Sequence, residues 1–207
     1  LPGVFQKKNL SMAILAAELC GLDSSKINTT LKKIKNISGR LELIKKYPNN
    51  IKVFIDYAHT PDALSEVLKS VRNVYSNNIS LVFGCGGERD FKKRPLMGKI
   101  AKQYCNKIYV TDDNPRNESP KKIRSEIINS LQGCTYFNIA NRSQAIKKAI
   151  MNAGPNEVIF IAGKGHENYQ DYGNRIISIS DKKIVKKIKL NKNNLSEKKI
   201  NYLFNSR

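Results

Sequence analysis

From about residue 53 onwards, the sequence alternates between short β-rich runs and amphipathic helical segments. In the first helical segment, residues 61–75, apolar side chains recur from Leu64 at i, i+3, i+4 and i+7, which places them on one helix face. Thr60 is suited to cap this helix, and Pro61 suits its first turn. We expect strands over residues 53–57, 80–83, 107–111, 135–140, 157–162 and 175–180, and further helices over residues 95–104, 119–131, 143–153 and 181–190. The alternation predicts an α/β fold, with a doubly wound, mostly parallel sheet and helices on both faces.

The length and composition fit one domain of ordinary size, or one domain plus part of another. The chain has 207 residues, of which 40% are hydrophobic and 26% charged, as is typical of globular proteins. No apolar run approaches the roughly 20 residues needed to span a bilayer, and the first residues do not resemble a signal peptide. We therefore expect a cytoplasmic protein without a membrane partner. Since the chain begins with Leu1 rather than Met, we expect its natural start to lie upstream.

The four cysteines are scattered along the chain and include no Cys-x-x-Cys pair (Cys20, Cys85, Cys105 and Cys134). This distribution is typical of reduced thiols in the cytosol. It predicts neither a disulfide framework nor a zinc site.

The formal net charge is +20, from 37 Lys and Arg residues against 17 Asp and Glu residues. Such an excess is typical of proteins that bind nucleic acids. The lysines, however, are spread along the whole chain among many asparagines, and aromatic residues are not interleaved with them as a stacking platform requires. Nucleic-acid binding is therefore the weaker interpretation, and the same field would also assist an anionic small substrate.

The two ends of the chain differ from the α/β pattern. Residues 11–19, which are rich in Ala, and residues 24–34 are predicted helices, and no strand is evident before about residue 38. This region looks like the end of a preceding domain, joined through Ser38, Gly39 and Arg40. Residues 191–207 are polar and basic, which indicates a solvated tail or a frayed helix.

A carboxylate, a carboxamide and a guanidinium stand together in one short loop after the strand expected at residues 107–111. They belong to Asp113, Asn114 and Arg116, and Pro115 stiffens the loop. Such a loop can grip a zwitterion, with Asp113 holding an ammonium group and Arg116 clamping a carboxylate in its planar fork. The alternative is an ordinary turn, since Asp-Asn and Asn-Pro are common turn formers.

Two Gly-rich loops follow other predicted strands. Residues 84–90, Gly-Cys-Gly-Gly-Glu-Arg-Asp, and residues 163–167, Gly-Lys-Gly-His-Glu, allow a backbone to approach a ligand closely. Neither loop has the spacing of a Walker A motif, and the first does not fit Gly-x-Gly-x-x-Gly. Glu167 could accept an ammonium group, and His166 could be a base or a metal ligand. The alternatives are a strained turn with Arg89 and Arg94 as surface charges, and a histidine that only packs.

A further polar turn, residues 56–62, links the first of these strands to the first helix. Asp56 and Asp62 could bind a metal or sugar hydroxyls, and His59 could act as a base or stack on a ring. A cap at Thr60, with Asp62 favouring the helix dipole, explains part of this turn without a ligand. The loops after residues 83, 111 and 162 leave the carboxyl ends of strands, where such sheets bind ligands, so we expect them to meet at one edge.

These loops, in this order, resemble those of the Mur ligase family. The matching segments are Asp56-Tyr-Ala-His-Thr-Pro-Asp-Ala-Leu64, Phe83-Gly-Cys-Gly-Gly-Glu-Arg-Asp90, Lys93-Arg-Pro-Leu-Met-Gly98, Thr111-Asp-Asp-Asn-Pro-Arg116 and Ala162-Gly-Lys-Gly-His-Glu-Asn-Tyr-Gln170. Gly3-Val-Phe-Gln-Lys-Lys-Asn9 and Gly39-Arg-Leu-Glu42 also fit. The resemblance runs from Leu1 to about Lys187. It implies a Rossmann-like C-terminal domain preceded by the helical end of a central ATPase domain.

By this resemblance, residues 1–38 end the central ATP-binding domain, residues 39–187 form the C-terminal amino-acid-binding domain, and residues 188–207 are a basic tail without a counterpart. Members of the family that add meso-2,6-diaminopimelate carry Asp-Asn-Pro-Arg, whereas members that add lysine depart at the Arg. The resemblance implies these diaminopimelate-binding residues: Arg89, Asp113, Asn114, Pro115 (which holds the loop), Arg116, Gly163 and Glu167. It also implies nucleotide contacts at Asn9 with adenine, at Arg40 with a phosphate, at Asp56 with the ribose or as a hinge, and at His59 near the adenine.

The implied activity is that of an ADP-forming acid–amino-acid ligase of peptidoglycan precursor synthesis. ATP, with Mg²⁺, would phosphorylate the D-glutamate carboxylate of UDP-N-acetylmuramoyl-L-alanyl-D-glutamate, and the amine of diaminopimelate would attack the acyl phosphate. The family's P-loop, carbamylated lysine, Mg²⁺ ligands and UDP-binding domain are absent from this sequence. We therefore expect no catalytic residue, no metal ligand and no ligation by this chain alone, and we expect a monomer. The alternatives are a non-catalytic amino-acid-binding module and a basic nucleic-acid-binding domain.

Overall fold

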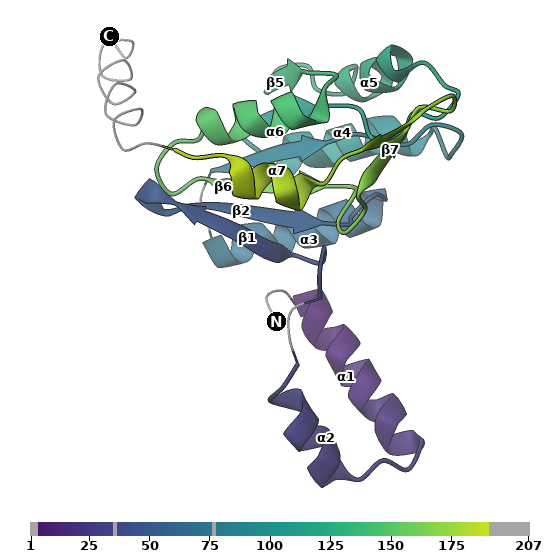
Figure 1. Cartoon of the computed structure of the whole chain (residues 1–207), viewed down its shortest axis with the longest axis vertical. Helices are drawn as coiled ribbons and strands as arrows, with labels where there is room; N and C mark the ends of the chain where they lie inside the picture. The colour runs from purple at the N-terminus through teal and green to yellow at the C-terminus, as the bar shows by residue number, and fades with distance from the viewer. Residues whose placement is uncertain (1–3, 35–36, 76–77, 191–207) are drawn as a thin grey trace.

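A six-stranded sheet with helices on both faces forms the α/β body of the protein (Figure 1). The computed structural model describes residues 4–34, 37–75 and 78–190. The strands of the sheet are β1 (Glu42–Tyr47), β2 (Ile51–Asp56), β3 (Ile79–Phe83), β4 (Lys107–Val110), β5 (Thr135–Asn138) and β6 (Val158–Ala162). The helices of the body are α3 (Pro61–Tyr75), α4 (Lys93–Tyr104), α5 (Pro120–Ile128), α6 (Arg142–Met151) and α7 (Asp181–Lys187), and a short 3₁₀ turn, Pro48–Asn50, joins β1 to β2. The predicted α/β fold is confirmed.

The order of the strands places several carboxyl ends together. The order is β1-β2-β6-β3-β4-β5, and every neighbouring pair except β1–β2 is parallel. In the register of the sheet, Asp56 pairs with Ala162, and Phe83 pairs with Val110. The loops that leave β2, β6, β3 and β4 therefore begin side by side, where parallel sheets of this kind bind ligands.

Two hydrophobic layers hold the helices to the sheet, because side chains alternate between the two faces of each strand. On β6, Phe160 packs in the layer that includes α3, α4 and α5, whereas Ile159 and Ile161 pack in the layer that includes α6 and α7. All of β6 is buried, as expected of a central parallel strand. The apolar face predicted for α3 is buried as well, and Thr60 caps this helix by accepting a hydrogen bond from the Ala63 N–H at 3.3 Å.

Three strands depart from the prediction. The sequence pattern does not predict β1, an antiparallel edge strand in which only Tyr47 of six residues is buried. The strand expected over residues 175–180 is shorter, and it does not join the main sheet. It is β8 (Ile176–Ser178), which pairs with β7 (Tyr169–Asp171) in a separate two-stranded hairpin. Neither strand of this hairpin has the buried apolar run that makes a core strand visible in a sequence.

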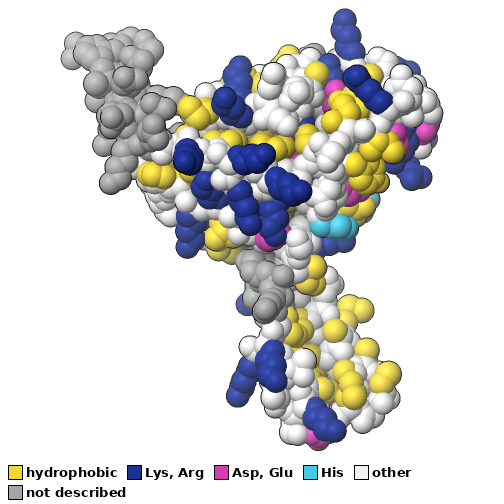
Figure 2. Space-filling view, in the orientation of Figure 1, with side chains coloured by type: hydrophobic (Ala, Val, Ile, Leu, Met, Phe, Trp, Pro, Cys, Tyr) yellow, Lys and Arg dark blue, Asp and Glu magenta, His cyan; other side chains and the backbone are white. Residues whose placement is uncertain are grey.

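Two helices, α1 (Val4–Leu19) and α2 (Ser24–Leu31), form an arm that projects from the α/β body (Figure 1). Both predicted N-terminal helices are present, although α1 begins earlier than expected. The Asp23 carboxylate caps α2 by accepting a hydrogen bond from the Lys26 N–H. Four large apolar side chains of the arm are more than half exposed, and hydrophobic atoms cover much of the arm in Figure 2 (Met12, Leu15, Leu19 and Leu22). Such a face is typical of a surface that contacts further protein. The domain boundaries at residues 38 and 187 stay predictions.

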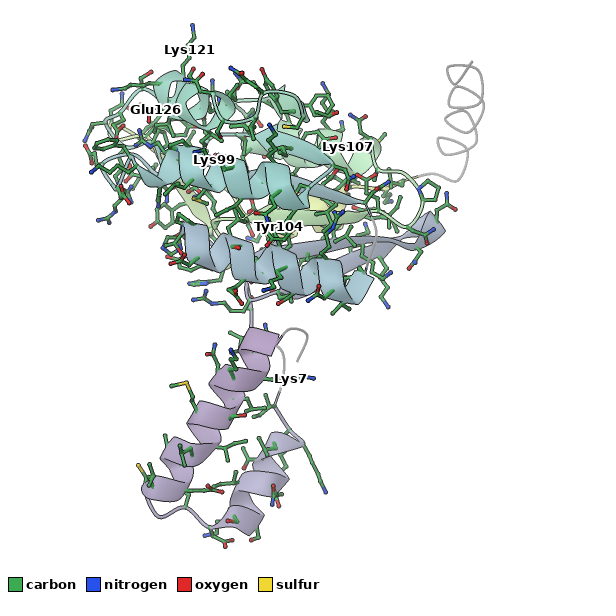
Figure 3. All side chains as sticks on the ribbon, turned by 180° about the vertical axis from the view of Figure 1, so that it is seen from behind. Lys7, Lys99, Tyr104, Lys107, Lys121 and Glu126 are labelled. Carbon is green, nitrogen blue, oxygen red and sulfur yellow. The ribbon has the colours of Figure 1, made fainter. Side chains whose placement is uncertain are left out.

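Basic side chains are spread over the face of the body seen in Figure 2 and recur on the arm. Lys99 and Lys121 point away from the body into solvent (Figure 3), whereas Lys102 donates to a backbone carbonyl, that of Gln132 at 2.6 Å. None of the described helices combines the length and the apolar character that crossing a bilayer requires. Of the predicted basic tail, residues 188–207, all but the first three residues lie outside the described part of the chain.

Candidate functional site

Four loops meet at the carboxyl edge of the sheet, following β2, β3, β4 and β6. Their backbones are tied together: the Gly163 N–H donates to the Asp56 carbonyl at 3.1 Å, and the Gly87 N–H donates to the Asn114 carbonyl at 2.9 Å. The predicted convergence of the loops after residues 83, 111 and 162 is therefore confirmed.

The loops surround a cavity of about 510 Å³, here called the loop cavity. It is lined by residues from all four loops and from the starts of α3 and α4, namely Tyr57, His59, Thr60, Pro61, Gly84, Cys85, Gly86, Arg89, Asp90, Lys93, Asp113, Asn114, Arg116, Gly163 and Glu167. Six of the seven residues expected to bind diaminopimelate are in this set, and Pro115 is not. Their roles in binding stay predictions.

Lys164 is the centre of a polar network beneath the loop cavity. Its side chain has no exposed surface, and its Nζ donates to Asn114 Oδ1 at 2.7 Å, to the Tyr169 carbonyl at 2.7 Å and to Glu167 Oε2 at 3.3 Å. Asp113 Oδ1 lies 3.4 Å from the same nitrogen. Asn114 Nδ2 in turn donates to Glu167 Oε2 at 3.2 Å. The carboxylates of Asp113 and Glu167 thus share one buried ammonium group.

Arg116 is held in an unusual backbone conformation beside the loop cavity. Its φ angle is +52°, in the left-handed region, and its N–H donates to the Asp171 carbonyl at 2.9 Å. Its Nη1 donates to the Gly87 carbonyl at 2.7 Å, and its Nε lies 3.8 Å from Asp171 Oδ2. A guanidinium carries five N–H donors, so most of them remain for a ligand in the cavity.

Gly163, in the loop after β6, lies close against Asp113 in the loop after β4. Its φ angle is +108°, and a Cβ atom at this position would lie 2.6 Å from Asp113 Oδ2. Only glycine combines this backbone conformation with such a close carboxylate. The position of Asp113 in the cavity therefore depends on the absence of a side chain at residue 163.

Two titratable groups on the cavity wall stay protonated at neutral pH. Burial, helped by the neighbouring Glu167 carboxylate, raises the pKa of the Tyr57 hydroxyl. Burial also raises the pKa of the Cys85 thiol to about 12. Since the thiolate is the nucleophilic form, Cys85 is poorly suited to attack a substrate.

The two arginines of the loop after β3 and of α4 have different surroundings. Arg89 lines the loop cavity, is exposed, and forms no ion pair with another described residue. Arg94 is buried and links α4 to Glu126 of α5 at 2.7 Å and to Glu118, in the loop before α5, at 2.9 Å. The alternative in which Arg94 is a surface charge is therefore wrong, because its side chain is 1% exposed.

Three of the four residues expected on the nucleotide side line a second cavity, of about 550 Å³, between the arm and α3. They are Asn9, Arg40 and Asp56, while His59 lines the loop cavity instead. The remaining walls of this arm cavity are mostly apolar. Gln6 Nε2 donates to the Arg40 carbonyl at 2.8 Å, and its buried Oε1 has no hydrogen-bond partner among the described residues. Apolar walls with a few polar groups fit a nucleoside base.

Asp56 ties the linker that follows the arm to the end of β2. Its Oδ2 accepts a hydrogen bond from the Leu41 N–H at 2.6 Å, and its Oδ1 accepts one from the Ala58 N–H at 2.7 Å. Burial raises the pKa of the Asp56 carboxyl, although these two donors act in the opposite direction. Because the backbone engages both oxygens, the geometry favours the hinge role over a ribose contact.

Asp56→Asn is expected to lower the free energy of unfolding by about 1–3 kcal/mol, because a buried N–H group then loses its acceptor. An asparagine side chain has one acceptor oxygen and would point its NH₂ group at one of the two backbone donors. Urea denaturation measures the change. Asp62→Asn, at an exposed position in the first turn of α3, is the control and is expected to change stability by less than about 0.5 kcal/mol. Equal losses in the two variants would contradict the hinge role.

The two histidines of the candidate loops pack against one tyrosine ring. The His59 ring meets the Tyr57 ring edge-on, with centroids 4.7 Å apart, and the His166 ring lies tilted against it at 5.5 Å. In the described part of the chain, no group of three or more His, Cys, Asp or Glu side chains could hold a metal ion. The described residues therefore do not fit a protein-only Mg²⁺ site.

The strand β7 organises the site, although no strand is expected there from the sequence pattern. Gln170 is buried, and its Nε2 donates to the carbonyls of Asp112 at 3.0 Å and Asp113 at 2.9 Å. The Asp171 N–H donates to Asn114 Oδ1 at 3.1 Å. The partners lie 57 or 58 positions away along the chain, so no local pattern shows these bonds.

The α/β body matches a known family model. The match covers residues 39–165, and the model is described as "Mur ligase, glutamate ligase domain". It includes all four loops of the loop cavity up to Gly165.

Two curated relatives are similar to most of the chain. Both are named UDP-N-acetylmuramoyl-L-alanyl-D-glutamate–2,6-diaminopimelate ligase. The one from Rickettsia felis is 45% identical over 188 residues, which are 90% of this chain and 35% of the relative. The one from Haemophilus influenzae is 42% identical over 185 residues, which are 89% of this chain and 38% of the relative. The chain thus spans little more than a third of the length of these relatives.

Solved structures show the same arrangement of elements. A structure of a UDP-N-acetylmuramoyl-L-alanyl-D-glutamate–2,6-diaminopimelate ligase has a TM-score of 0.69 and 35% identity, over 96% of this chain and 40% of that chain. The UDP-N-acetylmuramate–alanine ligase of Thermotoga maritima has a TM-score of 0.61 and 24% identity, over 79% of this chain and 35% of that chain, and it supports the fold alone.

Proposed function

The chain belongs to the Mur ligase family, and from this premise we propose that it carries the amino-acid site of a ligase that adds meso-2,6-diaminopimelate to UDP-N-acetylmuramoyl-L-alanyl-D-glutamate. The names of its relatives support this substrate. The observation that carries the proposal is the loop cavity, where carboxylates and guanidinium groups from the loops after β3, β4 and β6 line one space. Opposite charges on the wall of one cavity suit a ligand with both an ammonium and a carboxylate group.

In this proposal the loop cavity holds the end of diaminopimelate that does not react. The carboxylates of Asp113 and Glu167 accept hydrogen bonds from its ammonium group, Arg116 binds its carboxylate, and Asn114 and the Gly163 backbone complete the contacts. Arg89, which is free of other ion pairs in the described structure, provides a second cation for a carboxylate. Lysine lacks the distal carboxylate, so the two arginines favour diaminopimelate over lysine.

The arm cavity is the proposed position of the nucleotide. Asn9 and the unpaired Oε1 of Gln6 offer polar contacts to a base, and Arg40 offers a positive charge to a phosphate. ATP supplies the phosphoryl group that activates the D-glutamate carboxylate. We place the ligands of Mg²⁺, like the phosphoryl chemistry itself, in protein outside this chain, because the described residues offer no metal site.

The task of this chain is then to present the amine. By fixing the distal end of diaminopimelate, the loops orient the reacting amine toward the activated carboxylate and remove the entropy cost of a chance encounter. The arm and the linker at residues 37–41 connect this site to the phosphoryl-transfer region, so closure between the two would complete the active site. We propose that the reaction takes place in the cytoplasm and that the ligase is a monomer. The four free cysteines agree with a reducing compartment.

Purified ligase that includes the upstream region is expected to form the tripeptide product from ATP, diaminopimelate and the UDP-linked dipeptide, whereas the 207-residue chain alone is expected to form none. Mass spectrometry of the product measures both reactions. Ligation by the 207-residue chain would contradict the assignment of phosphoryl transfer to protein outside it. Absence of ligation by the longer protein, with diaminopimelate still bound, would favour the non-catalytic amino-acid-binding module instead. Tight, steeply salt-dependent binding to DNA or RNA would favour the nucleic-acid alternative.

A further inference from the structure

Lys164 has contacts that no part of the proposed reaction explains. It lies in the loop after β6, and its side chain has no exposed surface although lysine is rarely buried without a partner. Three acceptors take its hydrogen bonds: Asn114 Oδ1, Glu167 Oε2 and the Tyr169 carbonyl. An ammonium group has three N–H donors, so its hydrogen-bonding capacity is filled by the protein. Lys164 therefore cannot also serve as a ligand for a phosphate or a carboxylate in the cavity.

These hydrogen bonds fix the orientation of the Asn114 side chain. Its Oδ1 accepts from Lys164 at 2.7 Å and from the Asp171 N–H at 3.1 Å, so the oxygen must face the inside of the loop. Its Nδ2 then faces Glu167 and donates to Oε2 at 3.2 Å. Without the Lys164 ammonium group, the amide would lose one of the two donors that determine this orientation.

The charges around Lys164 leave one negative charge for a ligand. Asp113 and Glu167 carry two negative charges, and Lys164, within 3.4 Å of both, carries one positive charge. The nearby Asp112 is already paired with Arg124, and Asp181 with Arg142. A single ammonium group from a ligand would make this set neutral, whereas two carboxylates without Lys164 would repel each other at close range.

We propose that Lys164 is a positioning residue, whose buried ammonium group presets Asp113, Asn114 and Glu167 in the arrangement that receives one ammonium group of the amino-acid substrate. The role rests on the proposed function, because it needs a cationic ligand in the loop cavity. It gives that ligand a chemical definition: the end bound here carries one ammonium group, whatever carboxylate it presents to Arg116. Lys164 itself touches no ligand and acts through its three neighbours.

Lys107 provides a matched comparison within the same sheet. It is labelled in Figure 3 and lies at the start of β4, whereas the loop cavity lies beyond the carboxyl ends of the strands. Its Nζ donates to Glu157 Oε2 at 2.9 Å and to the Asn152 carbonyl at 3.1 Å. Like Lys164, it bonds a carboxylate and a backbone carbonyl. Its side chain is 26% exposed and remote from the site. If Lys164 only stabilised the fold, its replacement should affect ligand binding no more than the replacement of Lys107 does.

The test is a titration of the ¹⁵N-labelled 207-residue chain with meso-diaminopimelate, followed by NMR, for the wild type, Lys164→Met and Lys107→Met. We expect Lys164→Met to weaken binding roughly tenfold or more, and to shift the Asn114 side-chain NH₂ signals before any ligand is added. We expect Lys107→Met to leave the dissociation constant within about twofold of the wild type. Thermal unfolding of both variants separates loss of stability from loss of binding.

Equal binding by the wild type and Lys164→Met would overturn the role of Lys164 and leave the proposed function intact. Unchanged Asn114 signals in Lys164→Met would overturn it as well. No binding by the wild-type chain would count against the proposed substrate and, through it, against this role.

If Lys164→Met does not fold, the titration is repeated with Lys164→Ala in the presence of ethylammonium, which supplies the missing ammonium group. Ethanol, an uncharged compound of similar size, is the control. The ammonium compound is expected to restore the Asn114 signals and the binding of diaminopimelate, and the alcohol is not. Equal rescue by both compounds, or rescue by neither, would overturn the inference.

Discussion

Arg142→Met is expected to lower the free energy of unfolding by about 3–5 kcal/mol, because it leaves the Asp181 carboxylate buried without a counter-charge. Both side chains of this ion pair have no exposed surface, and Arg142 Nε and Nη2 donate to Asp181 at 2.9 and 2.7 Å. Burial alone would lower the pKa of Arg142. The Asp181 carboxylate outweighs this effect and raises the pKa above the ordinary value of arginine, so the guanidinium stays charged. Arg142 Nη2 also donates to the Ala162 carbonyl at 2.9 Å, which joins α6, α7 and the end of β6. Urea denaturation measures the loss.

Lys182→Met is the control for this prediction. Lys182 follows Asp181 on α7 and pairs with Glu42, but its side chain is 38% exposed, so its loss is expected to cost less than about 1 kcal/mol. A double variant, Arg142→Met with Asp181→Leu, is expected to recover much of the lost stability, because no unpaired charge remains in the core. If Arg142→Met lowered the free energy of unfolding no more than Lys182→Met, the prediction that breaking a buried ion pair is the more costly change would be wrong.

Arg116→Ala is expected to weaken the binding of diaminopimelate about tenfold to a hundredfold more than the binding of lysine. In the proposed site, the variant removes charge-assisted hydrogen bonds to a distal carboxylate that lysine lacks, and such bonds contribute about 1.5–3 kcal/mol. Titration calorimetry of the complete ligase with each amino acid measures the two losses.

Arg175→Ala is a charge-matched control for Arg116→Ala. Arg175 is exposed on the hairpin of β7 and β8, beside the Tyr172 ring, and it does not line the loop cavity. Its removal is expected to affect diaminopimelate and lysine equally, within about twofold. If Arg116→Ala weakened both ligands equally, Arg116 would not be the residue that binds the distal carboxylate.

The parts of the fold that the sequence predicts are those with a strong local pattern. Every residue of β6 is buried, so the strand appears in the sequence as a continuous apolar run. In α3 every third or fourth residue is buried, so the helix appears as regularly spaced apolar residues. The edge strand β1 lacks such a pattern, since its backbone pairing with β2 places only Tyr47 in the core. β7 is three residues long, and the hydrogen bonds that hold it join it to a distant loop.

The same distinction applies to the candidate site. Asp113 and Arg116 are conspicuous because an acid and a base stand in one short loop after a strand, and parallel strands bring such loops to one edge. The role of Lys164 is not visible in the sequence, since its partner Asn114 lies 50 positions away along the chain. Only the folded arrangement places them together.

Gly39 has a mechanical consequence that follows from its position in the linker. A Cβ atom at Gly39 would lie 2.5 Å from the His166 nitrogen and 2.6 Å from the Gly165 carbonyl carbon, so the linker backbone rests directly on the loop that carries Lys164 and Glu167. The next residue, Arg40, lies over the Tyr57 ring, with its guanidinium carbon 4.9 Å from the ring centroid. The two backbones are packed so closely that no side chain fits between them at Gly39. A swing of the arm about this linker would therefore press on the loop after β6 or release it, and a change in the arm cavity would be transmitted to the loop cavity through contacts between main chains.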